Sequence, residues 1–323
     1  MARVLISTDY LHPGDEVDVL LRAEGHETVH QTLAGAAPDR VVAALDGIDA
    51  ALIGNDPLTA DVLARARSLR VVVRTGVGHD SVDIEAAARH GITVSNLPGI
   101  NAHAVAEYTL GLLLAAARRL VEGASGVAAG GWPREDGREL RGSTLGLVGY
   151  GAAARAVVPL AQAFGMTVLC ATSVPEEQRG GADVRFVALE ELLATSDFVS
   201  VHTALTDRTR GLLGAEAFAA MKPTAILVNT SRGAVVDEPA LAEAVRSGAV
   251  AGAHLDVVAS EPLPADSVLR GVPGVVVYSH LAGQTAEARR AAGLAGAREL
   301  VAALDGRAQH SVNAHLFDRA TTP

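Results

Sequence analysis

A glycine-containing turn near the middle of the chain is the feature that most constrains its fold. The apolar run Leu145–Val148 leads directly into Gly149-x-Gly151-x-x-Ala154, and helix-forming residues follow. In such a strand–turn–helix, the first glycine permits the tight turn, the second lets phosphates approach the backbone, and the small third residue lets the helix pack on the strand. The free N–H groups of the helix N-terminus favour an anion. The segment therefore predicts a dinucleotide-binding βαβ unit.

Short apolar strands alternate with helices along the chain, which predicts an α/β fold with parallel sheets. The expected strands are 3–7, 51–53, 71–73, 93–95, 144–148, 167–170, 198–202, 225–229, 252–255 and 275–278. The expected helices are 16–24, 59–68, 84–90, 101–120, 152–164, 189–194, 214–220, 238–247 and 285–304. The polar, glycine-rich stretch Gly123–Arg141 receives no element.

Length and composition limit the class of protein. A chain of 323 residues fits two domains, and its net charge of −10 argues against nucleic acid or an anionic membrane as a partner. Cys170 is the single cysteine, which excludes an intrachain disulfide; we expect it to be a buried strand residue of a cytoplasmic protein. The first residues read as a strand without a signal peptide, and no apolar run is long enough to span a membrane.

The end of the second strand bears on which dinucleotide binds. NAD sites usually carry an acidic residue there that holds the ribose hydroxyls. In this chain Thr172 and Ser173 occupy that place, and Arg179 follows, although Glu176 and Glu177 lie closer in sequence. A carboxylate would repel a 2′-phosphate, whereas hydroxyl groups can donate hydrogen bonds to it. The missing acid favours NADP, with NAD through weaker ribose contacts as the alternative.

Three later strands end in charged residues, at the edge where open α/β sheets bind ligands. Arg232 can clamp a carboxylate with two hydrogen bonds. Asp256 and Glu261 follow the next strand, and His280 follows the last. A histidine exchanges protons near neutral pH, and a hydrogen-bonded glutamate would fix its tautomer. Together these residues predict an acid–base site beside the dinucleotide.

These segments resemble the D-isomer-specific 2-hydroxyacid dehydrogenase family, which includes phosphoglycerate dehydrogenase and glyoxylate/hydroxypyruvate reductase. The resemblance covers about Val71 to Ala286. It is carried by five motifs in the family's order: Arg74-Thr-Gly-Val-Gly78, Asn96 to Glu107, Asn229-Thr-Ser-Arg232-Gly233, Asp256 to Pro262, and Ser279-His280-Leu-Ala-Gly283.

The resemblance implies two Rossmann-like lobes with parallel sheets, in which a nucleotide domain (100–283) is inserted into a discontinuous, flavodoxin-like substrate domain (1–99 and 284–323). The active site would lie in the cleft between them. It also implies a homodimer that pairs through the nucleotide domains, to which the long helix 101–120 contributes.

The family's roles map onto this chain residue by residue. Arg232 would bind the substrate carboxylate and carbonyl oxygen, His280 would be the general acid or base, and Glu261 would pair with His280. The implied substrate contacts are Arg74, Val77, Gly78 and Asn101. The implied cofactor contacts are Gly149, Gly151, Ala152, Ala153, Thr172, Ser173, His202, Thr203, Thr209, Thr230, Asp256 (to the nicotinamide carboxamide) and Gly283. No metal is implied.

The chain departs from the family pattern at several positions. Thr172 replaces the usual acid, Ala204 replaces a common proline, and Tyr278-Ser279 replaces the usual Thr-Pro before the histidine. Gly54-Asn55 stands where phosphoglycerate dehydrogenases often have a phosphate-binding arginine, which weakens a 3-phosphoglycerate assignment.

We expect an NAD(P)-dependent oxidoreductase that acts on a small 2-ketoacid or D-2-hydroxyacid, such as glyoxylate or hydroxypyruvate. Family alternatives are 3-phosphoglycerate, formate, or a phosphite or phosphonate substrate. A remote alternative is a non-catalytic, dinucleotide-sensing corepressor, because fold alone does not fix function.

Overall fold

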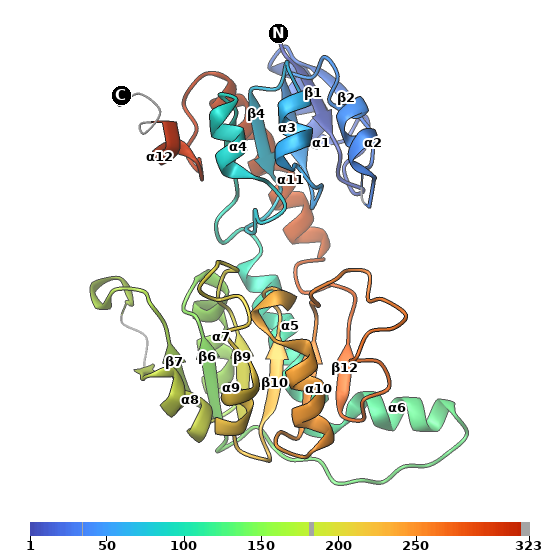
Figure 1. Cartoon of the computed structure of the whole chain (residues 1–323), viewed down its shortest axis with the longest axis vertical. Coiled ribbons are helices and arrows are strands. Elements are labelled where there is room, and N and C mark those ends of the chain that lie inside the picture. The colour runs from blue at the N-terminus through green and yellow to red at the C-terminus, as the bar shows by residue number, and fades with distance from the viewer. Residues whose placement is uncertain (34, 181–183, 318–323) are drawn as a thin grey trace. The chain divides into compact units, whose positions relative to one another are not determined.

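The computed structural model describes residues 1–33, 35–180 and 184–317, and the chain divides into two compact units (Figure 1). Unit 1 comprises Met1–Asn101 and Thr285–Pro323, and unit 2 comprises Ala102–Gln284. From the sequence, we assign substrate binding to residues 1–99 and 284–323 and nucleotide binding to residues 100–283. That functional assignment stays a prediction.

Unit 1 contains a five-stranded sheet in which every neighbouring pair is parallel, with the order β2-β1-β3-β4-β5. That is the flavodoxin-like strand order. Its strands are β1 (Arg3–Ile6), β2 (Glu27–His30), β3 (Ala50–Ile53), β4 (Val71–Arg74) and β5 (Thr93–Ser95). Its helices are α1 (Glu16–Ala23), α2 (Pro38–Ala44), α3 (Ala60–Arg65), α4 (Ile84–Arg89), α11 (Ala286–Leu304) and α12 (Ala314–Phe317).

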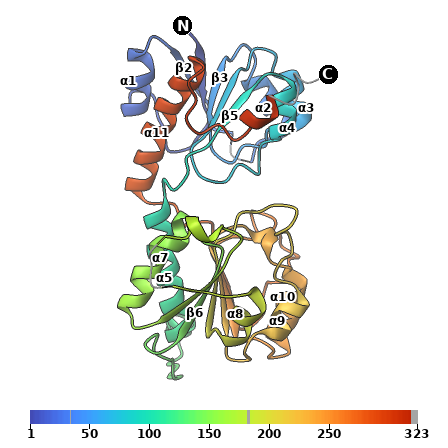
Figure 2. The ribbon, with the colours of Figure 1, turned by 90° about the vertical axis from the view of Figure 1, so that its left-hand side faces the viewer.

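Helices cover both faces of this sheet, with α1 and α11 on one face and α2, α3 and α4 on the other (Figure 2). The central strands are therefore apolar throughout, as in Val71–Val73, where every side chain is buried. Side-chain caps begin several helices: Asp15 accepts hydrogen bonds from the N–H groups of Val17 and Asp18, both at 2.9 Å.

Helix α11 comes from the far end of the chain, yet it completes a core of unit 1. Its residues Ala297, Leu300 and Ala303 are buried in one cluster with side chains of β1, β3 and β4. A Cβ atom at Gly296 would lie 2.7 Å from a methyl carbon of Leu52, so the helix packs closely against β3.

Unit 2 contains a seven-stranded sheet, again with only parallel pairs, in the order β12-β11-β10-β9-β6-β7-β8. Its strands are β6 (Thr144–Val148), β7 (Thr167–Ala171), β8 (Arg185–Phe186), β9 (Phe198–Val201), β10 (Ile226–Asn229), β11 (Gly252–Leu255) and β12 (Val275–Val277). Its helices are α5 (Ala102–Arg118), α6 (Leu120–Ala128), α7 (Ala152–Ala163), α8 (Leu189–Thr195), α9 (Ala215–Ala220) and α10 (Glu238–Arg246), with short 3₁₀ turns η1 (Glu176–Gln178) and η2 (Gly233–Val235).

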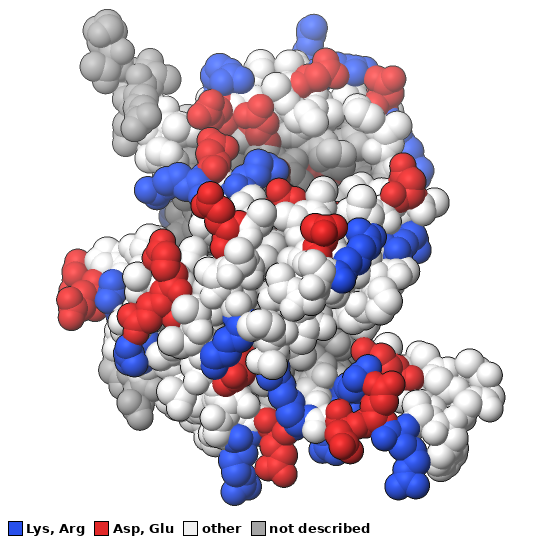
Figure 3. All heavy atoms as spheres, turned by 60° about the horizontal axis from the view of Figure 1, so that its bottom comes forward, with Lys and Arg blue, Asp and Glu red and all other residues white. Residues whose placement is uncertain are grey.

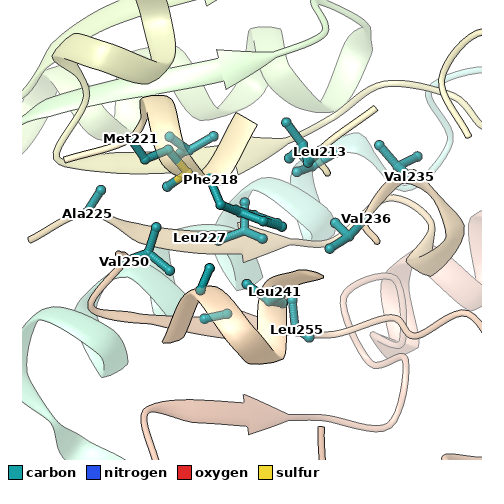
Figure 4. Close-up of a cluster of buried hydrophobic side chains, with 14 of the residues drawn as sticks. Leu213, Phe218, Met221, Ala225, Leu227, Val235, Val236, Leu241, Val250 and Leu255 are labelled. Carbon is teal, nitrogen blue, oxygen red and sulfur yellow. The ribbon is translucent and has the colours of Figure 1, made fainter. Parts of the chain in front are cut away.

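Two hydrophobic cores flank this sheet. Helices α5 and α7 cover one face and α8, α9 and α10 cover the other (Figure 2). Figure 4 shows the second core, in which Phe218 of α9 and Leu241 of α10 meet Leu227 of β10. The first core contains Cys170, which is fully buried as predicted, and burial raises the pKa of its thiol to about 12.

The predicted α/β fold with two parallel sheets is confirmed, although the expected elements omitted β2, β8, α2, α6 and α12. The glycine-rich stretch Gly123–Arg141 was given no element, but α6 extends over Leu120–Ala128 into it. Leu120, Val121 and Val127 supply apolar, helix-compatible positions that Gly123 and Gly126 obscure in the sequence.

Acidic and basic side chains are intermixed on the molecular face drawn in Figure 3, without a continuous patch of one sign. Within residues 1–33, 35–180 and 184–317, no helix combines the length and the apolar character that a membrane crossing requires.

Candidate functional site

Nearly all the predicted catalytic and cofactor-binding residues of unit 2 lie at the carboxyl edge of its sheet. Because all seven strands are parallel, their carboxyl ends lie along one edge (Figure 1). The sets that follow the individual strands are Gly149–Ala153 after β6, Thr172 and Ser173 after β7, His202 and Thr203 after β9, Thr230 and Arg232 after β10, Asp256 after β11, and His280 and Gly283 after β12.

The glycine turn after β6 has the geometry that its residues predict. Gly149 has φ +101°, and a Cβ atom there would lie 2.7 Å from the backbone of His202 and Thr203. Only glycine suits that conformation and that close approach. Gly151, in contrast, faces open space, since a Cβ atom there would meet nothing within 4 Å.

Helix α7 begins at Ala152, and no side chain caps its first turn. The first N–H groups of a helix lack partners within the helix, and they favour an anionic ligand. Open space at Gly151 and an uncapped helix N-terminus therefore fit the pyrophosphate of a dinucleotide.

The end of β7 carries hydroxyl and basic groups instead of an acid. Thr172 accepts a hydrogen bond from the Val174 N–H at 3.1 Å, and Ser173 is exposed. Arg155 of α7 donates to the carbonyl oxygens of Gln178 and Arg179, at 2.7 and 3.1 Å. These bonds hold its guanidinium next to the loop that follows Thr172.

Residues after β9 and β10 form the next part of the edge. Ser200 Oγ lies 2.9 Å from His202 Nε2, and burial lowers the pKa of His202 to about 4, so this imidazole is neutral near pH 7. Thr209 donates to the carbonyl of Ala204 at 2.7 Å and closes the turn beyond Thr203. Thr230 Oγ1 lies 3.1 Å from Thr109 Oγ1 of α5, which fixes the end of β10 against that helix.

Arg232 is presented by a turn that Asn229 organises. The buried Asn229 side chain accepts from the N–H of Ser231 at 3.0 Å and donates to the carbonyl of Arg232 at 2.9 Å. A Cβ atom at Gly233 would lie 1.9 Å from the carbonyl carbon of Val258, so only glycine lets the turns after β10 and β11 pass this closely. Sequence reasoning gave Asn229 no role; its place at the end of a buried strand was the available signal.

His280 and Glu261 form the predicted pair. His280 Nδ1 lies 2.7 Å from Glu261 Oε2, while Glu261 Oε1 accepts from the Val258 N–H at 3.2 Å. Burial alone would raise the pKa of Glu261, but the hydrogen bond and charge of His280 outweigh it and lower that pKa. With Nδ1 engaged by a carboxylate, Nε2 is the ring nitrogen left for a ligand.

Asp256 anchors the turn that carries His280. Its two carboxylate oxygens accept the N–H groups of Leu281 and Ala282, both at 2.8 Å, and its carbonyl accepts the N–H of His280 at 2.9 Å. His280 has φ +58°, a left-handed conformation that residues other than glycine rarely adopt. This anchoring was not predicted from the sequence, whereas a contact of Asp256 with nicotinamide stays a prediction.

Unit 1 carries the other predicted residues at the carboxyl edge of its own sheet. Arg74 ends β4 and hydrogen-bonds Asn55, and a Cβ atom at Gly76 would overlap the Arg74 guanidinium. Asn96 holds the following loop by donating to the Val77 carbonyl at 2.6 Å.

The Val77–Gly78 loop has the donors that an anion needs. Within the described part of the chain, the N–H groups of Val77 and Gly78 donate to no other protein group. Two adjacent backbone donors suit a carboxylate. Asn101 lies at the last position of this part of unit 1, directly before α5.

Comparison with known proteins agrees with this geometry. Residues 110–282 match the family model described as "D-isomer specific 2-hydroxyacid dehydrogenase, NAD binding domain". The chain is 42% identical over 264 residues to a glyoxylate reductase from Aeropyrum pernix, which covers 78% of each chain. It is also 42% identical over 275 residues to a D-3-phosphoglycerate dehydrogenase from Mycobacterium leprae, which covers 83% of this chain and 52% of the relative.

Among solved structures, a glyoxylate reductase from Paecilomyes thermophila superposes with a TM-score of 0.86 at 27% identity, over 97% of this chain and 99% of that protein. The match extends through both units. The chain therefore belongs to the D-isomer specific 2-hydroxyacid dehydrogenase family, as an oxidoreductase that depends on a nicotinamide dinucleotide.

Proposed function

We propose that this enzyme interconverts a small 2-ketoacid and the corresponding D-2-hydroxyacid, with His280 as the acid or base. The observation that carries the proposal is the 2.7 Å contact between His280 Nδ1 and Glu261 Oε2 at the sheet edge that also bears the dinucleotide turn. Such a pair leaves Nε2 as the ring nitrogen that can give and take a proton.

In the reduction, a dinucleotide held at the Gly149–Ala153 turn would supply the hydride that adds to the carbonyl carbon. Negative charge then develops on the carbonyl oxygen, and His280 Nε2 donates the proton that converts it to a hydroxyl. Glu261 stabilises the protonated ring beforehand and keeps its orientation afterwards. In the oxidation, neutral His280 accepts the hydroxyl proton at the same atom.

Arg232 supplies positive charge for the substrate's carboxylate and carbonyl oxygen. The Asn229 turn restrains its backbone, so less freedom is lost when the guanidinium binds. In the same proposal, unit 1 supplies Arg74, Asn101 and the N–H groups of Val77 and Gly78 as substrate contacts. Prepositioned donors of this kind stabilise charge in the transition state.

We propose NADP as the preferred dinucleotide. Thr172 and Ser173 leave the end of β7 without a carboxylate that would repel a 2′-phosphate. The Arg155 guanidinium, fixed by two backbone carbonyls in the adjoining loop, supports the same choice because it adds positive charge there. The remaining contacts assigned to the dinucleotide are Gly149, Ala152, Ala153, His202, Thr203, Thr209, Thr230, Asp256 and Gly283.

We also propose that the chain forms a homodimer through unit 2. Helix α6 has no buried residue, and it projects from the rest of unit 2 (Figure 1). Leu120 and Val127 of this helix are about half exposed, and Trp132 beyond it is 78% exposed. Apolar residues gathered on a projecting element favour burial against a partner.

A panel of substrates tests the enzyme proposal. Glyoxylate, hydroxypyruvate, pyruvate and 3-phosphohydroxypyruvate would each be reduced with NADPH and with NADH, and formate and phosphite would be tested with the oxidised cofactors. We expect turnover with an unphosphorylated ketoacid, fastest with NADPH. Absence of turnover with every ketoacid would contradict the proposal and favour a dinucleotide-sensing role.

A phosphorylated substrate is the second candidate, because one relative at 42% identity is a D-3-phosphoglycerate dehydrogenase and Arg74 offers a basic group. Preference for 3-phosphohydroxypyruvate in the same panel, lost in Arg74→Leu, would replace the first candidate with this one.

A further inference from the structure

Two polar residues that precede Asp256 and His280 in the chain contact each other: His254 of β11 and Tyr278, which directly follows β12. His254 lies on β11 two residues before Asp256, and Tyr278 lies two residues before His280. His254 Nδ1 and the Tyr278 hydroxyl are 3.0 Å apart, a hydrogen-bond distance. The register of the two strands pairs His254 with Val276 and Leu255 with Val277, so Tyr278 lies just beyond the paired residues of β12, where its hydroxyl contacts His254.

The strand that carries His280 needs such support. Strand β12 has three residues, none of them buried, and it lies at the edge of the sheet with β11 as its single neighbour. His280 follows it in a left-handed conformation. A short edge strand that ends in an unfavourable backbone conformation holds its position only if surrounding contacts determine it.

Among the described residues, bonds from the backbone N–H groups after β12 leave a gap at Ser279. Tyr278 donates its N–H to the Leu255 carbonyl at 2.8 Å, and the Asp256 contacts begin at His280. The Tyr278 side chain adds contacts between this segment and the interior of unit 2. Its ring packs edge-on against Tyr108 of α5, with centroids 6.2 Å apart, and lies 5.9 Å from the His254 ring.

Burial has the largest effect on the pKa values of this pair, and nearby carboxylates modify it. Burial, opposed by Glu122 of α6, lowers the pKa of His254. Burial, aided by Glu122 and Asp256, raises the pKa of Tyr278, and burial, aided by Asp256, raises that of Tyr108 to about 12. The pKa shifts of His254 and Tyr278 both favour the uncharged forms, an imidazole and a phenol, which share one hydrogen bond.

We propose that His254 and Tyr278 are positioning residues, whose hydrogen bond fixes the end of β12 and thereby the placement of His280. This inference rests on the proposed function of His280. Because His254 is 3% exposed, its ring cannot exchange the phenol for bulk water without moving.

Tyr278→Phe tests the proposal because it removes one oxygen and keeps the ring. We expect kcat for ketoacid reduction to fall about tenfold, as misplacement of a catalytic group does, with the KM for the cofactor unchanged. The alkaline limb of the kcat/KM profile should also move. His254→Leu should reproduce these effects, whereas His254→Asn, which keeps a hydrogen-bonding atom near the place of Nδ1, should restore most of the activity.

Ser196→Ala is the matched control. It removes a buried hydroxyl that donates to the Leu192 carbonyl at 2.7 Å, before β9 and hence at the opposite end of the sheet. We expect it to lower the melting temperature without changing kcat or the pH profile. If Tyr278→Phe behaves like this control, the pair is structural and the proposal is wrong.

A readout without turnover separates this inference from the proposed function. In ¹⁵N-histidine-labelled protein, the ring signals of His280 should shift or broaden in Tyr278→Phe and stay in place in Ser196→Ala. Unchanged His280 signals in Tyr278→Phe would overturn the positioning role even if the wild type reduced none of the ketoacids. Absence of wild-type turnover would instead contradict the proposed function.

Discussion

The carboxyl edges of the two sheets carry polar residues in contrasting states. In unit 2, the His280 and Glu261 side chains are paired yet remain 31% and 37% exposed, so a ligand can reach them. In unit 1, Asp56 is 3% exposed, and Ser7 and the Gly54 N–H hydrogen-bond its carboxylate. The same type of edge thus carries an accessible ionisable pair in one unit and a closed polar core in the other.

The surroundings of the acidic residues explain the contrast. The pKa of Asp56 is raised because burial outweighs its hydrogen bonds and the charge of Arg74, whereas the contact with His280 reverses the effect of burial on the pKa of Glu261. We infer that unit 2 provides acid–base chemistry and that unit 1 provides recognition through neutral donors and Arg74.

The largest effect that would sharpen this comparison is expected for His280→Ala. Loss of the acid–base group should reduce kcat by about 10²- to 10⁴-fold. Cofactor binding, measured by fluorescence titration, should stay intact because the ring lies outside the glycine turn. His90→Ala, at an exposed histidine after α4, serves as the control and should leave kcat unchanged. A normal kcat in His280→Ala would remove its assigned role.

Asp18→Asn should have the opposite profile, affecting stability more than catalysis. Asp18 of α1 is buried and accepts bonds from Thr28, His30, Arg22 and the Gly14 N–H, which together outweigh burial and lower its pKa. The variant should lose about 2 kcal/mol at pH 7, the range for hydrogen bonds to a charged group.

The pH dependence gives the sign of the Asp18 effect. Its folded pKa lies below the unfolded value of about 3.9, so its contribution is present above that pH and is lost as the pH falls toward the folded pKa. Urea unfolding of wild type and Asp18→Asn should therefore differ at pH 7 and converge in acid. A difference that stays constant with pH would contradict an ionic role for Asp18.

The smallest effect is expected for Thr172→Asp, which tests the cofactor side of unit 2. A new carboxylate should repel a 2′-phosphate and shift the ratio of kcat/KM values toward NADH by about tenfold, or about 1.4 kcal/mol. Thr172→Asn, which adds similar bulk without charge, separates repulsion from crowding. An equal shift in both variants would show that charge at this position does not select the cofactor.

The sequence was most informative where a run of one residue type is compatible with only one kind of element. Buried parallel strands are continuous apolar runs, so strands such as β6 and β11 matched their predicted bounds. Edge strand β2 was not predicted because Glu27 and His30 interrupt its apolar pattern. Strand β8 was not predicted because two residues are too few to form a pattern. Helix α6 was obscured by its glycines.

The candidate site divides in the same way. Gly149 and the Glu261–His280 pair could be identified from residue type and from their places after apolar strands. The anchoring by Asp256 and the contact of His254 with Tyr278 could not, because they depend on the register of β11 with β12, in which His254 lies opposite Val276. A sequence lists such side chains without showing which ones face each other.

The late position of α11 in the chain has a consequence for synthesis. During translation, unit 1 begins to emerge first, but its sheet lacks the helix that covers β3 and β4 until residues 286–304 have followed. Asn313, which bonds the backbone of Ile92 and Val94, arrives later still. Domains generally fold as units in order of emergence. Here the sequence of the inserted unit 2 is complete before that of unit 1. We therefore expect unit 2 to fold first on the ribosome, although unit 1 contains the N-terminus.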